Sequence, residues 1–376
     1  MGPLQGVKVI ELAGIGPGPM CAMLLADLGA TVLRIDRPAA EELALSRPLR
    51  TNLLLRSRET LSLDLKNPAG RDLVLKLVEQ ADVLTEGFRP GVTERLGLGP
   101  QDCFQRNEKL VYGRMTGWGQ DGPLAQAAGH DLNYIALTGA LHAIGPRGGP
   151  PVPPLNLVAD FGGGALYLAF GICAALLDAR RSGRGQVVDA TMLDGVASLM
   201  TAFSGMLASG VNTTTRGTNT LDGGAYFYQV YECADSEYIS LAPIEPKFHA
   251  ELIARLGLDP VDFVQADRAG WQAAHEKLAA VIRTRTRAEW AAALEGTDVC
   301  FAPVLSLPEA AAHPHNRARG TFVEVDGIVQ SGPAPRFSRT VPDTPTPPRK
   351  PNPDAALAAW LTPAEIDALR AEGVIG

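Results

Sequence analysis

The sequence predicts an α/β protein with a large domain built on a parallel sheet and a smaller α+β domain. Strand-like and helix-like segments alternate along the N-terminal part, which is the pattern of a parallel sheet covered on both faces. The chain has 376 residues, about two and a half times a typical ~150-residue domain. Its 46% apolar and 20% charged residues exclude intrinsic disorder.

The first elements form a βαβ unit. Residues 7–12 are typical of a strand, residues 19–28 of a helix and residues 31–36 of a second strand. The alternation then continues, with a strand expected at 61–65, a helix at 68–81 and strands at 83–84 and 109–116.

The loop after the first strand contains three glycines, Gly14, Gly16 and Gly18. Asp36 ends the next strand about 20 residues later, so a dinucleotide-binding fingerprint is one interpretation. That fingerprint needs a further glycine where Pro19 stands, because helix and strand must pack closely there. We therefore favour a sheet unit without a nicotinamide, with Pro19 in the first turn of the helix.

The second half of the chain predicts a long apolar helix and then smaller elements. The helix is expected over about 164–179, and 187–199 is typical of a strand that turns into a helix. Short strands at 225–231 and 238–242 and helices at 248–256, 271–283 and 287–294 indicate a small α+β domain. Residues 333–353 are proline-rich and extended, and Thr362, Pro363 and Glu365 form a helix start.

Charge and hydropathy limit the possible partners. The net charge is −7, so no overall positive field attracts nucleic acid or an anionic membrane. The longest apolar candidate, 161–177, contains three consecutive glycines, and we expect no membrane-spanning helix. Residues 1–6 lack the basic start of a signal peptide, so an intracellular, cytoplasmic location is expected. The five cysteines form no Cys-x-x-Cys pair, which disfavours zinc and a disulfide framework.

Six basic residues nevertheless lie near predicted strand ends, where open α/β sheets bind ligands. They are either solvated surface charges or a local site for a phosphorylated ligand. These residues are Arg34, Arg37, Lys66, Arg89, Arg95 and Arg114.

Two residues stand out as candidates for acid/base chemistry. His130 directly precedes an apolar-periodic run, which places it near a helix N-terminus, where unpaired amides disfavour imidazolium and keep the ring neutral. Asp160 precedes a glycine triplet, 162–164, and the long apolar helix. Both positions are equally typical of helix caps. The triplet favours function at Asp160, because close approach of backbone to a ligand needs glycine. Glu245, between a strand and a helix, is by itself an ordinary loop carboxylate.

The sequence resembles the family III coenzyme A transferases, and within them the α-methylacyl-CoA racemases, from Val7 to about Thr340. The segments that carry the resemblance are 11–19, 25–30, 34–38, 63–66, 88–97 and 116–120, and the most specific ones are 129–134, 156–164, 221–224 and 244–248.

This resemblance implies a Rossmann-like large domain over 1–187, completed by 326–376, and a small domain over 222–310. Linkers would occupy 188–221 and 311–325, and two subunits would interlock as a homodimer. Coenzyme A would lie across the large domain. Its implied contacts are Arg37, Leu63, Asp64, Leu65, Lys66, Arg89, Arg95, Gly129, Leu132, Asn133 and Tyr134.

The resemblance also implies a mechanism. His130 and Asp160 would flank C2 of a 2-methylacyl-CoA, one removing a proton and the other returning one on the opposite face. Backbone amides at the start of the helix after Asp160 would hold the enolate oxygen. Glu245 would orient His130, and Asp131 and Asn156 would support the pair from behind. Acyl-CoA is then the substrate, and no metal or redox cofactor is required.

Two rival hypotheses remain open. In a coenzyme A transferase, Asp160 would be a nucleophile that forms mixed anhydrides and thioesters. His130 and the Glu245-Pro246-Lys247-Phe248 segment argue against this, because transferases of the family usually lack that pairing. A non-catalytic CoA-binding protein is the alternative from another class, and it would predict a missing catalytic residue.

Overall fold

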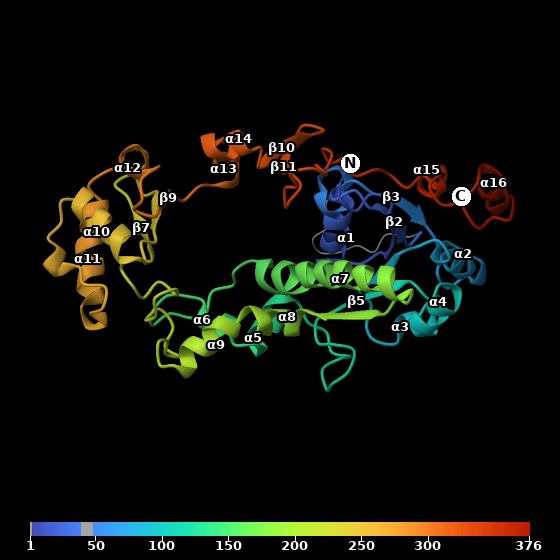
Figure 1. The fold of residues 1–376 in the computed structure, drawn as a ribbon, viewed down its shortest axis with the longest axis horizontal. Helices are drawn as coiled ribbons and strands as arrows, with labels where there is room; N and C mark the ends of the chain where they lie inside the picture. Colours follow the sequence, from blue (N-terminus) through green and yellow to red (C-terminus); the bar gives the residue numbers. More distant parts are fainter. Residues whose placement is uncertain (1, 39–47) are drawn as a thin grey trace. The chain divides into compact units, whose positions relative to one another are not determined.

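The structure is a computed structural model that describes residues 2–38 and 48–376. Its described residues divide into two compact units (Figure 1). Unit 1 is drawn from Met1–Thr138, Leu155–Leu199 and Pro314–Gly376, and unit 2 from Gly139–Pro154 and Met200–His313. Residues 139–154, expected in the large domain, belong to unit 2, and the expected linkers 188–221 and 311–325 are each divided between the two units.

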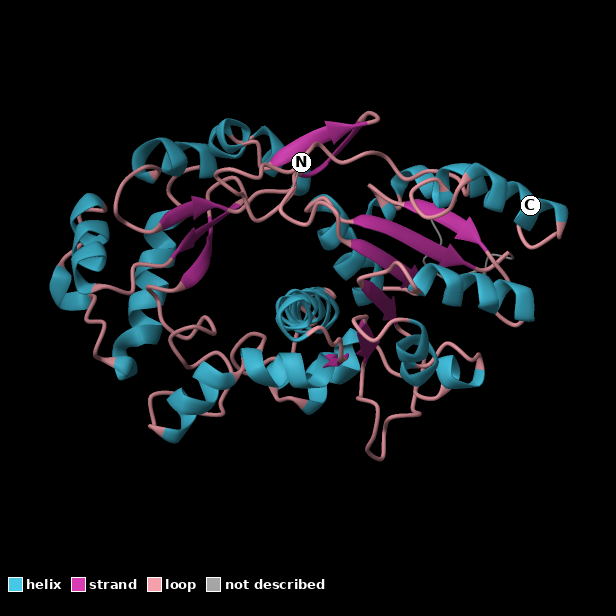
Figure 2. Ribbon diagram, turned by 45° about the vertical axis from the view of Figure 1, so that its right-hand side comes forward, coloured by secondary structure: helices cyan, strands magenta, loops and turns pink. Residues whose placement is uncertain are grey.

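Unit 1 is built on a six-stranded parallel sheet, as predicted. The strand order is β3-β2-β1-β4-β5-β6, and each neighbouring pair is parallel (Figure 2). The chain runs outward from β1 to β3 and returns to β4 beside β1, so the topological switch point lies between β1 and β4. The strands are β1 (Lys8–Leu12), β2 (Thr31–Asp36), β3 (Glu59–Ser62), β4 (Val83–Glu86), β5 (Val111–Thr116) and β6 (Val187–Thr191).

Helices and a hairpin complete unit 1. The helices are α1 (Pro17–Asp27), α2 (Pro68–Val78), α3 (Val92–Arg95), α4 (Pro100–Arg106), α5 (Asp131–Leu137), α7 (Leu166–Ser182), α8 (Met192–Leu199), α14 (Pro314–Arg319), α15 (Pro353–Leu357) and α16 (Pro363–Ala371). Strands β10 (Phe322–Val325) and β11 (Ile328–Ser331) pair antiparallel.

The C-terminal segment is part of the unit 1 core. Leu357, Trp360 and Ile366 are buried in one cluster with Leu33 and Leu61 of the sheet. Residues 332–352 contain no helix or strand, as their proline content predicted. The predicted start of α16 is confirmed, because the Thr362 hydroxyl accepts from the Glu365 amide and the Glu365 carboxylate accepts from the Thr362 amide.

Unit 2 has an α+β architecture, as predicted for the small domain. Its antiparallel sheet has the order β7-β8-β9. Tyr226, Tyr231, Leu252, Trp271 and Trp290 are buried in its core. The elements are α6 (Ala140–Ala143), α9 (Thr201–Ala208), β7 (Gln229–Glu232), β8 (Tyr238–Leu241), α10 (Pro246–Arg255), α11 (Trp271–Ile282), α12 (Arg287–Leu294), β9 (Phe301–Pro303) and α13 (Leu307–Ala312).

The long apolar helix begins earlier than predicted. Residues Leu157–Ala165 form a π-helix that runs directly into α7, so Asp160 lies in the first turn of a helix and not ahead of one. Packing contacts account for glycine within the triplet 162–164. A Cβ on Gly163 would lie 2.8 Å from the Val196 amide, and a Cβ on Gly195 would lie 1.9 Å from the Gly163 carbonyl oxygen. Gly163 and Gly195 therefore allow close packing of this helix against α8, a role that the sequence did not predict.

Replacing Gly195 with alanine is expected to destabilise unit 1 by about 1–3 kcal/mol, because backbone lies where the new methyl group must go. Gly18→Ala is the matched control, since no atom outside its own helix lies within 4 Å of a Cβ there. Urea unfolding measures both variants. Equal stability of the two would contradict the packing account.

The π-helix and α7 together form a 26-residue helix, Leu157–Ser182, that is long and apolar enough to cross a membrane by length and composition. Core helices of globular proteins also meet these two criteria, so the expectation that no helix spans a membrane stays a prediction. One side of α7 packs on β5 and β6 in unit 1. The other side exposes Leu166 by 52%, Phe170 by 75% and Leu177 by 69%.

Candidate active site

Asp160 lies at the carboxyl end of β1, beside the switch point of the sheet. The loop between β1 and α1 passes directly over its side chain. Gly16 has φ of 63°, and a Cβ on it would lie 3.1 Å from Asp160 Oδ2. Ligands of open α/β sheets bind in this crevice. The sequence analysis did not assign Gly16 to the site, although the glycine-rich loop was the signal for a close backbone approach.

The Asp160 carboxyl group is half-buried and hydrogen-bonded. Burial raises its pKa from the ordinary value, and the charge of Asp131 acts in the same direction. Asn156 Nδ2 donates to Asp160 Oδ2 at 2.9 Å and, with the charge of His130, lowers the pKa in part. The protonated form is therefore more accessible than for a surface aspartate, which suits a group that must both give and take a proton.

Asp131 ties the two candidate elements together. It is the first residue of α5 and only 6% exposed. Its Oδ2 accepts hydrogen bonds from the amides of Ala159 and Asp160, both at 2.8 Å. Its Oδ1 is buried and has no hydrogen-bond partner among the described residues. The carboxylate thus fixes the π-helical turn that carries Asp160 to the helix that follows His130.

His130 is the N-cap residue of α5, so the prediction of a helix N-terminus is confirmed. Its amide donates to Asn133 Oδ1 at 3.1 Å, which fixes the backbone at this point. The residue itself is exposed, so a ligand can reach the imidazole. Because Asp131, the next residue in the chain, accepts hydrogen bonds from the Ala159 and Asp160 amides, the structure brings the two predicted acid/base groups to one place in unit 1.

The predicted donors for an enolate oxygen need correction. Two amides in the first turn of the π-helix, those of Ala159 and Asp160, are already used by Asp131. The amides of the glycine triplet lie inside the continuous helix, where they pair along the helix. Amides after Asp160 therefore do not form the free helix start that the sequence suggested.

Most of the predicted coenzyme A contacts lie at the carboxyl edge of the sheet. Arg37 follows β2 and the segment 63–66 follows β3; the two are neighbours, because the Leu63 amide donates to the Asp36 carbonyl oxygen at 2.8 Å. Arg89 follows β4 and Arg95 ends α3. The exposed members are Arg37, Asp64, Lys66, Arg89 and Arg95, while Leu63 is buried and Leu65 is partly buried.

Two of the six basic residues are not available to a phosphate. Arg34 is buried and pairs with Glu11 at 2.8 Å, and Arg114 is buried and pairs with Glu86 at 2.9 Å. Both pairs are opposite each other in adjacent parallel strands. Their charges stabilise the sheet, so the hypothesis of a six-residue phosphate site is wrong for these two.

The segment around α5 divides between surface and interior. Leu132 is 44% exposed and Asn133 is exposed, so both can contact a ligand. Tyr134 is buried, and its hydroxyl donates to the Gly129 carbonyl oxygen. Burial and the charge of Asp160 raise the pKa of Tyr134 to about 12. Tyr134 thus belongs to the support of the site more than to its surface.

Glu245 lies in unit 2, where it is exposed and is the N-cap residue of α10.

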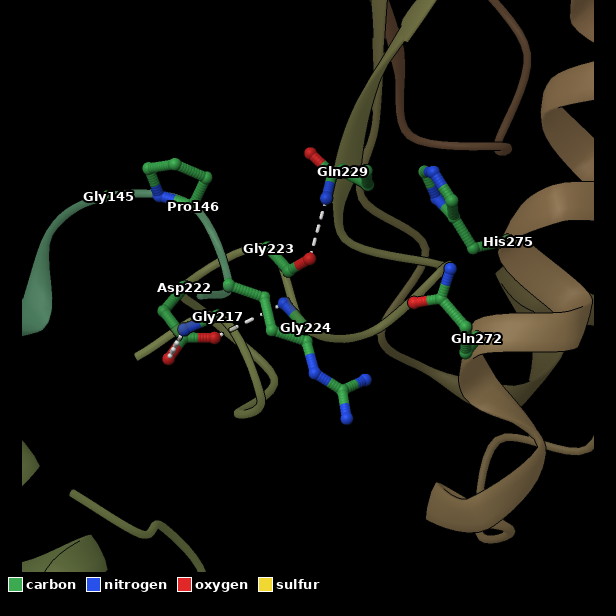
Figure 3. A pocket seen from close by; sticks show the side chains of 10 residues that line it. Gly145, Pro146, Gly217, Asp222, Gly223, Gly224, Gln229, Gln272 and His275 are labelled. Carbon is green, nitrogen blue, oxygen red and sulfur yellow. Dashed lines mark hydrogen bonds between the residues drawn. The ribbon is translucent and has the colours of Figure 1, made fainter. Parts of the chain in front are cut away.

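Unit 2 also contains a polar cavity of about 430 Å³ (Figure 3). Its floor is the segment 221–224, in which Asp222 accepts hydrogen bonds from the amides of Gly217 and Gly224 (Figure 3). Gln229 Nε2 donates to the Gly223 carbonyl oxygen. This motif therefore organises a loop of unit 2.

The described residues contain no group of three His, Cys, Asp or Glu side chains that could hold a metal ion.

Comparison with known proteins identifies the family of the chain. The chain belongs to CoA-transferase family III, whose family model matches residues 4–356. It is 45% identical to an α-methylacyl-CoA racemase of Mus musculus over 93% of this chain and 90% of the relative. It is 43% identical to an α-methylacyl-CoA racemase of Homo sapiens over 90% and 87% of the two chains. A crystal structure of a CAIB/BAIF family protein from Brucella suis superposes with a TM-score of 0.83 at 26% identity, covering 97% and 100% of the two chains.

Proposed function

We propose that the protein is a racemase that interconverts the (2R) and (2S) epimers of 2-methylacyl-CoA thioesters. The observation that carries the proposal is that Asp131 joins the N-terminus of α5, where His130 lies, to the helical turn of Asp160 beside the β1–α1 loop. The high identity to two α-methylacyl-CoA racemases supports the same reaction.

In the proposed reaction His130 removes the C2 proton from one epimer, and an enolate forms. Protonated Asp160 then returns a proton to the opposite face, and the roles exchange in the reverse direction. Each positioned proton transfer contributes about 10²–10⁴-fold to the rate. Asn156 and Asp131 hold Asp160 through the contacts described above.

We further propose that coenzyme A binds along the exposed basic residues at the same edge. Arg37, Arg89 and Arg95 can meet its phosphates through bidentate contacts. Leu132 and Asn133 lie next to the reacting thioester in this arrangement. The chemistry is complete with protein acids and bases, so no metal or redox cofactor is required.

A homodimer forms part of the proposal. The exposed stripe of Leu166, Phe170 and Leu177 on α7 repeats at helical spacing, and apolar stripes of this kind mark protein interfaces. A second copy of the chain is the proposed cover. Light scattering is expected to show a dimer for the wild type and a monomer for Phe170→Glu. A monomeric wild type that binds lipid vesicles would contradict the proposal.

The decisive experiment incubates each pure epimer of a 2-methylacyl-CoA with the enzyme in D₂O. The proposal expects deuterium at C2 together with epimerisation, starting from either epimer. A coenzyme A transferase would instead exchange acyl groups with a free carboxylic acid through Asp160 and add no deuterium at C2. That outcome would replace the racemase with the transferase.

Asn156→Ala is expected to move the pH profile upward. The Asn156 hydrogen bond lowers the pKa of Asp160, so its loss raises that pKa. The reactive pair carries one proton in either direction, and a second proton on Asp160 inactivates it. The acidic limb of kcat/KM therefore moves to higher pH by the same amount from either epimer. An unchanged profile in both directions would contradict the assignment of Asp160.

A further inference from the structure

The segment Gly117-Trp118, directly after β5, contacts the loop that carries His130. A Cβ on Gly117 would lie 2.0 Å from Tyr134 Cζ, so the Tyr134 ring rests directly on the Gly117 backbone. The Trp118 and Tyr134 rings meet edge to face, with centroids 4.7 Å apart and an interplanar angle of 84°. The end of a central strand thereby fixes the position of one aromatic ring in α5.

The same two rings enclose Gly129, the residue before His130. A Cβ on Gly129 would lie 2.8 Å from Tyr134 Cε1 and 2.9 Å from Trp118 Cζ2. The Tyr134 hydroxyl also donates to the Gly129 carbonyl oxygen. Gly129 can therefore shift only if one of the rings moves, and the backbone of His130 moves with it.

Trp118 Nε1 is buried and has no hydrogen-bond partner among the described residues. An unpaired buried donor is unfavourable, so the indole is held there by its packing and not by a hydrogen bond. A phenylalanine at this position would keep an aromatic ring and remove the unpaired donor. It would not reproduce the indole edge beside Gly129.

We propose that Trp118 and Tyr134 are positioning residues that clamp Gly129 and so aim the His130 imidazole at C2 of the substrate. This inference rests on the proposed function. The clamp connects β5 to His130 through the two rings, whereas the Asp160 carboxyl group is hydrogen-bonded by Asn156. Asp131 is shared by both elements, because it follows His130 and binds the Asp160 amide, so the test leaves Asp131 in place and changes only the two rings and Asn156.

The test compares deuterium exchange on the two faces of C2, the face next to His130 and the face next to Asp160. A variant that misplaces only His130 keeps Asp160 as a working base, so the epimer whose proton faces Asp160 still takes up deuterium, without inversion. The other epimer loses exchange. Trp118→Ala is expected to lower exchange on the His130 face about 10²-fold and Tyr134→Phe about 10-fold, since small misplacements have effects of this size. Asn156→Ala is the matched control and lowers exchange on the Asp160 face.

Equal losses on both faces, or no loss in Trp118→Ala and Tyr134→Phe, would overturn the clamp. Trp118→Phe guards against misfolding, because it is expected to keep the thermal midpoint and still lose several-fold on the His130 face. If the wild type exchanges neither epimer, the proposed function fails, and NMR of the His130 ring resonances tests the clamp alone. The clamp then requires these resonances to shift or broaden in Trp118→Ala and Tyr134→Phe, and unchanged resonances overturn it.

Discussion

Asp160→Asn is expected to reduce epimerisation by about 10²–10⁴-fold, while one epimer still exchanges its C2 proton. The side-chain amide of this variant cannot return a proton to the face of C2 next to it. His130 remains a base, so the epimer whose proton faces His130 takes up deuterium with retention of configuration. The measurement follows deuterium by mass spectrometry and configuration by chiral chromatography, starting from each epimer separately.

His130→Gln is the mirror-image experiment, and exchange should survive only from the other epimer. Asp367→Asn, an exposed side chain on α16, is the control for a lost carboxylate and should retain wild-type rates. If Asp160→Asn lost exchange from both epimers with an unchanged fold, Asp160 would have a role other than a one-face base. Nucleophilic catalysis would then be the better account of this residue.

Local sequence patterns predicted most elements of unit 1, because the residues that start these elements are close neighbours in the chain. The capping box of Thr362 and Glu365 and the proline at 363 are short-range signals, and α16 begins where they indicate. The same holds for His130, whose place before an apolar-periodic run predicted the N-cap of α5. Both positions depend on neighbours within a single turn.

The failures depend on partners far away in the chain. The π-helix around Asp160 packs against α8, and Gly163 of the π-helix is in close contact with Gly195 of α8. Arg34 and Arg114 lie inside strands, opposite glutamates of the neighbouring strands, whereas Arg37 and Arg89 follow the ends of their strands. A strand-by-strand alignment of charges could have revealed these pairs, whereas their nearness to strand ends could not.

The second large effect is expected at Arg56, which is 2% exposed and joins strand β11 to helix α1 within unit 1. Its guanidinium pairs with Asp27 of α1 and donates to Gln330 Oε1 at 2.9 Å and to the Ser331 carbonyl oxygen at 2.7 Å. Arg56→Met is expected to destabilise unit 1 by about 3–5 kcal/mol, because it leaves Asp27 as an unpaired buried carboxylate. Chemical unfolding followed by tryptophan fluorescence measures this loss.

The double variant separates the charge from the packing. Burial already raises the pKa of Asp27, and its hydrogen bond and charge pairing with Arg56 oppose that rise. Adding Asp27→Asn to Arg56→Met removes the uncompensated charge and should recover part of the loss, with a coupling energy of about 0.5–3 kcal/mol. No recovery would mean that the destabilisation comes from the lost contacts to Gln330 and Ser331 in β11. The unfolding of wild type, two single variants and the double variant therefore distinguishes an ion pair that stabilises α1 from an anchor that holds the C-terminal hairpin.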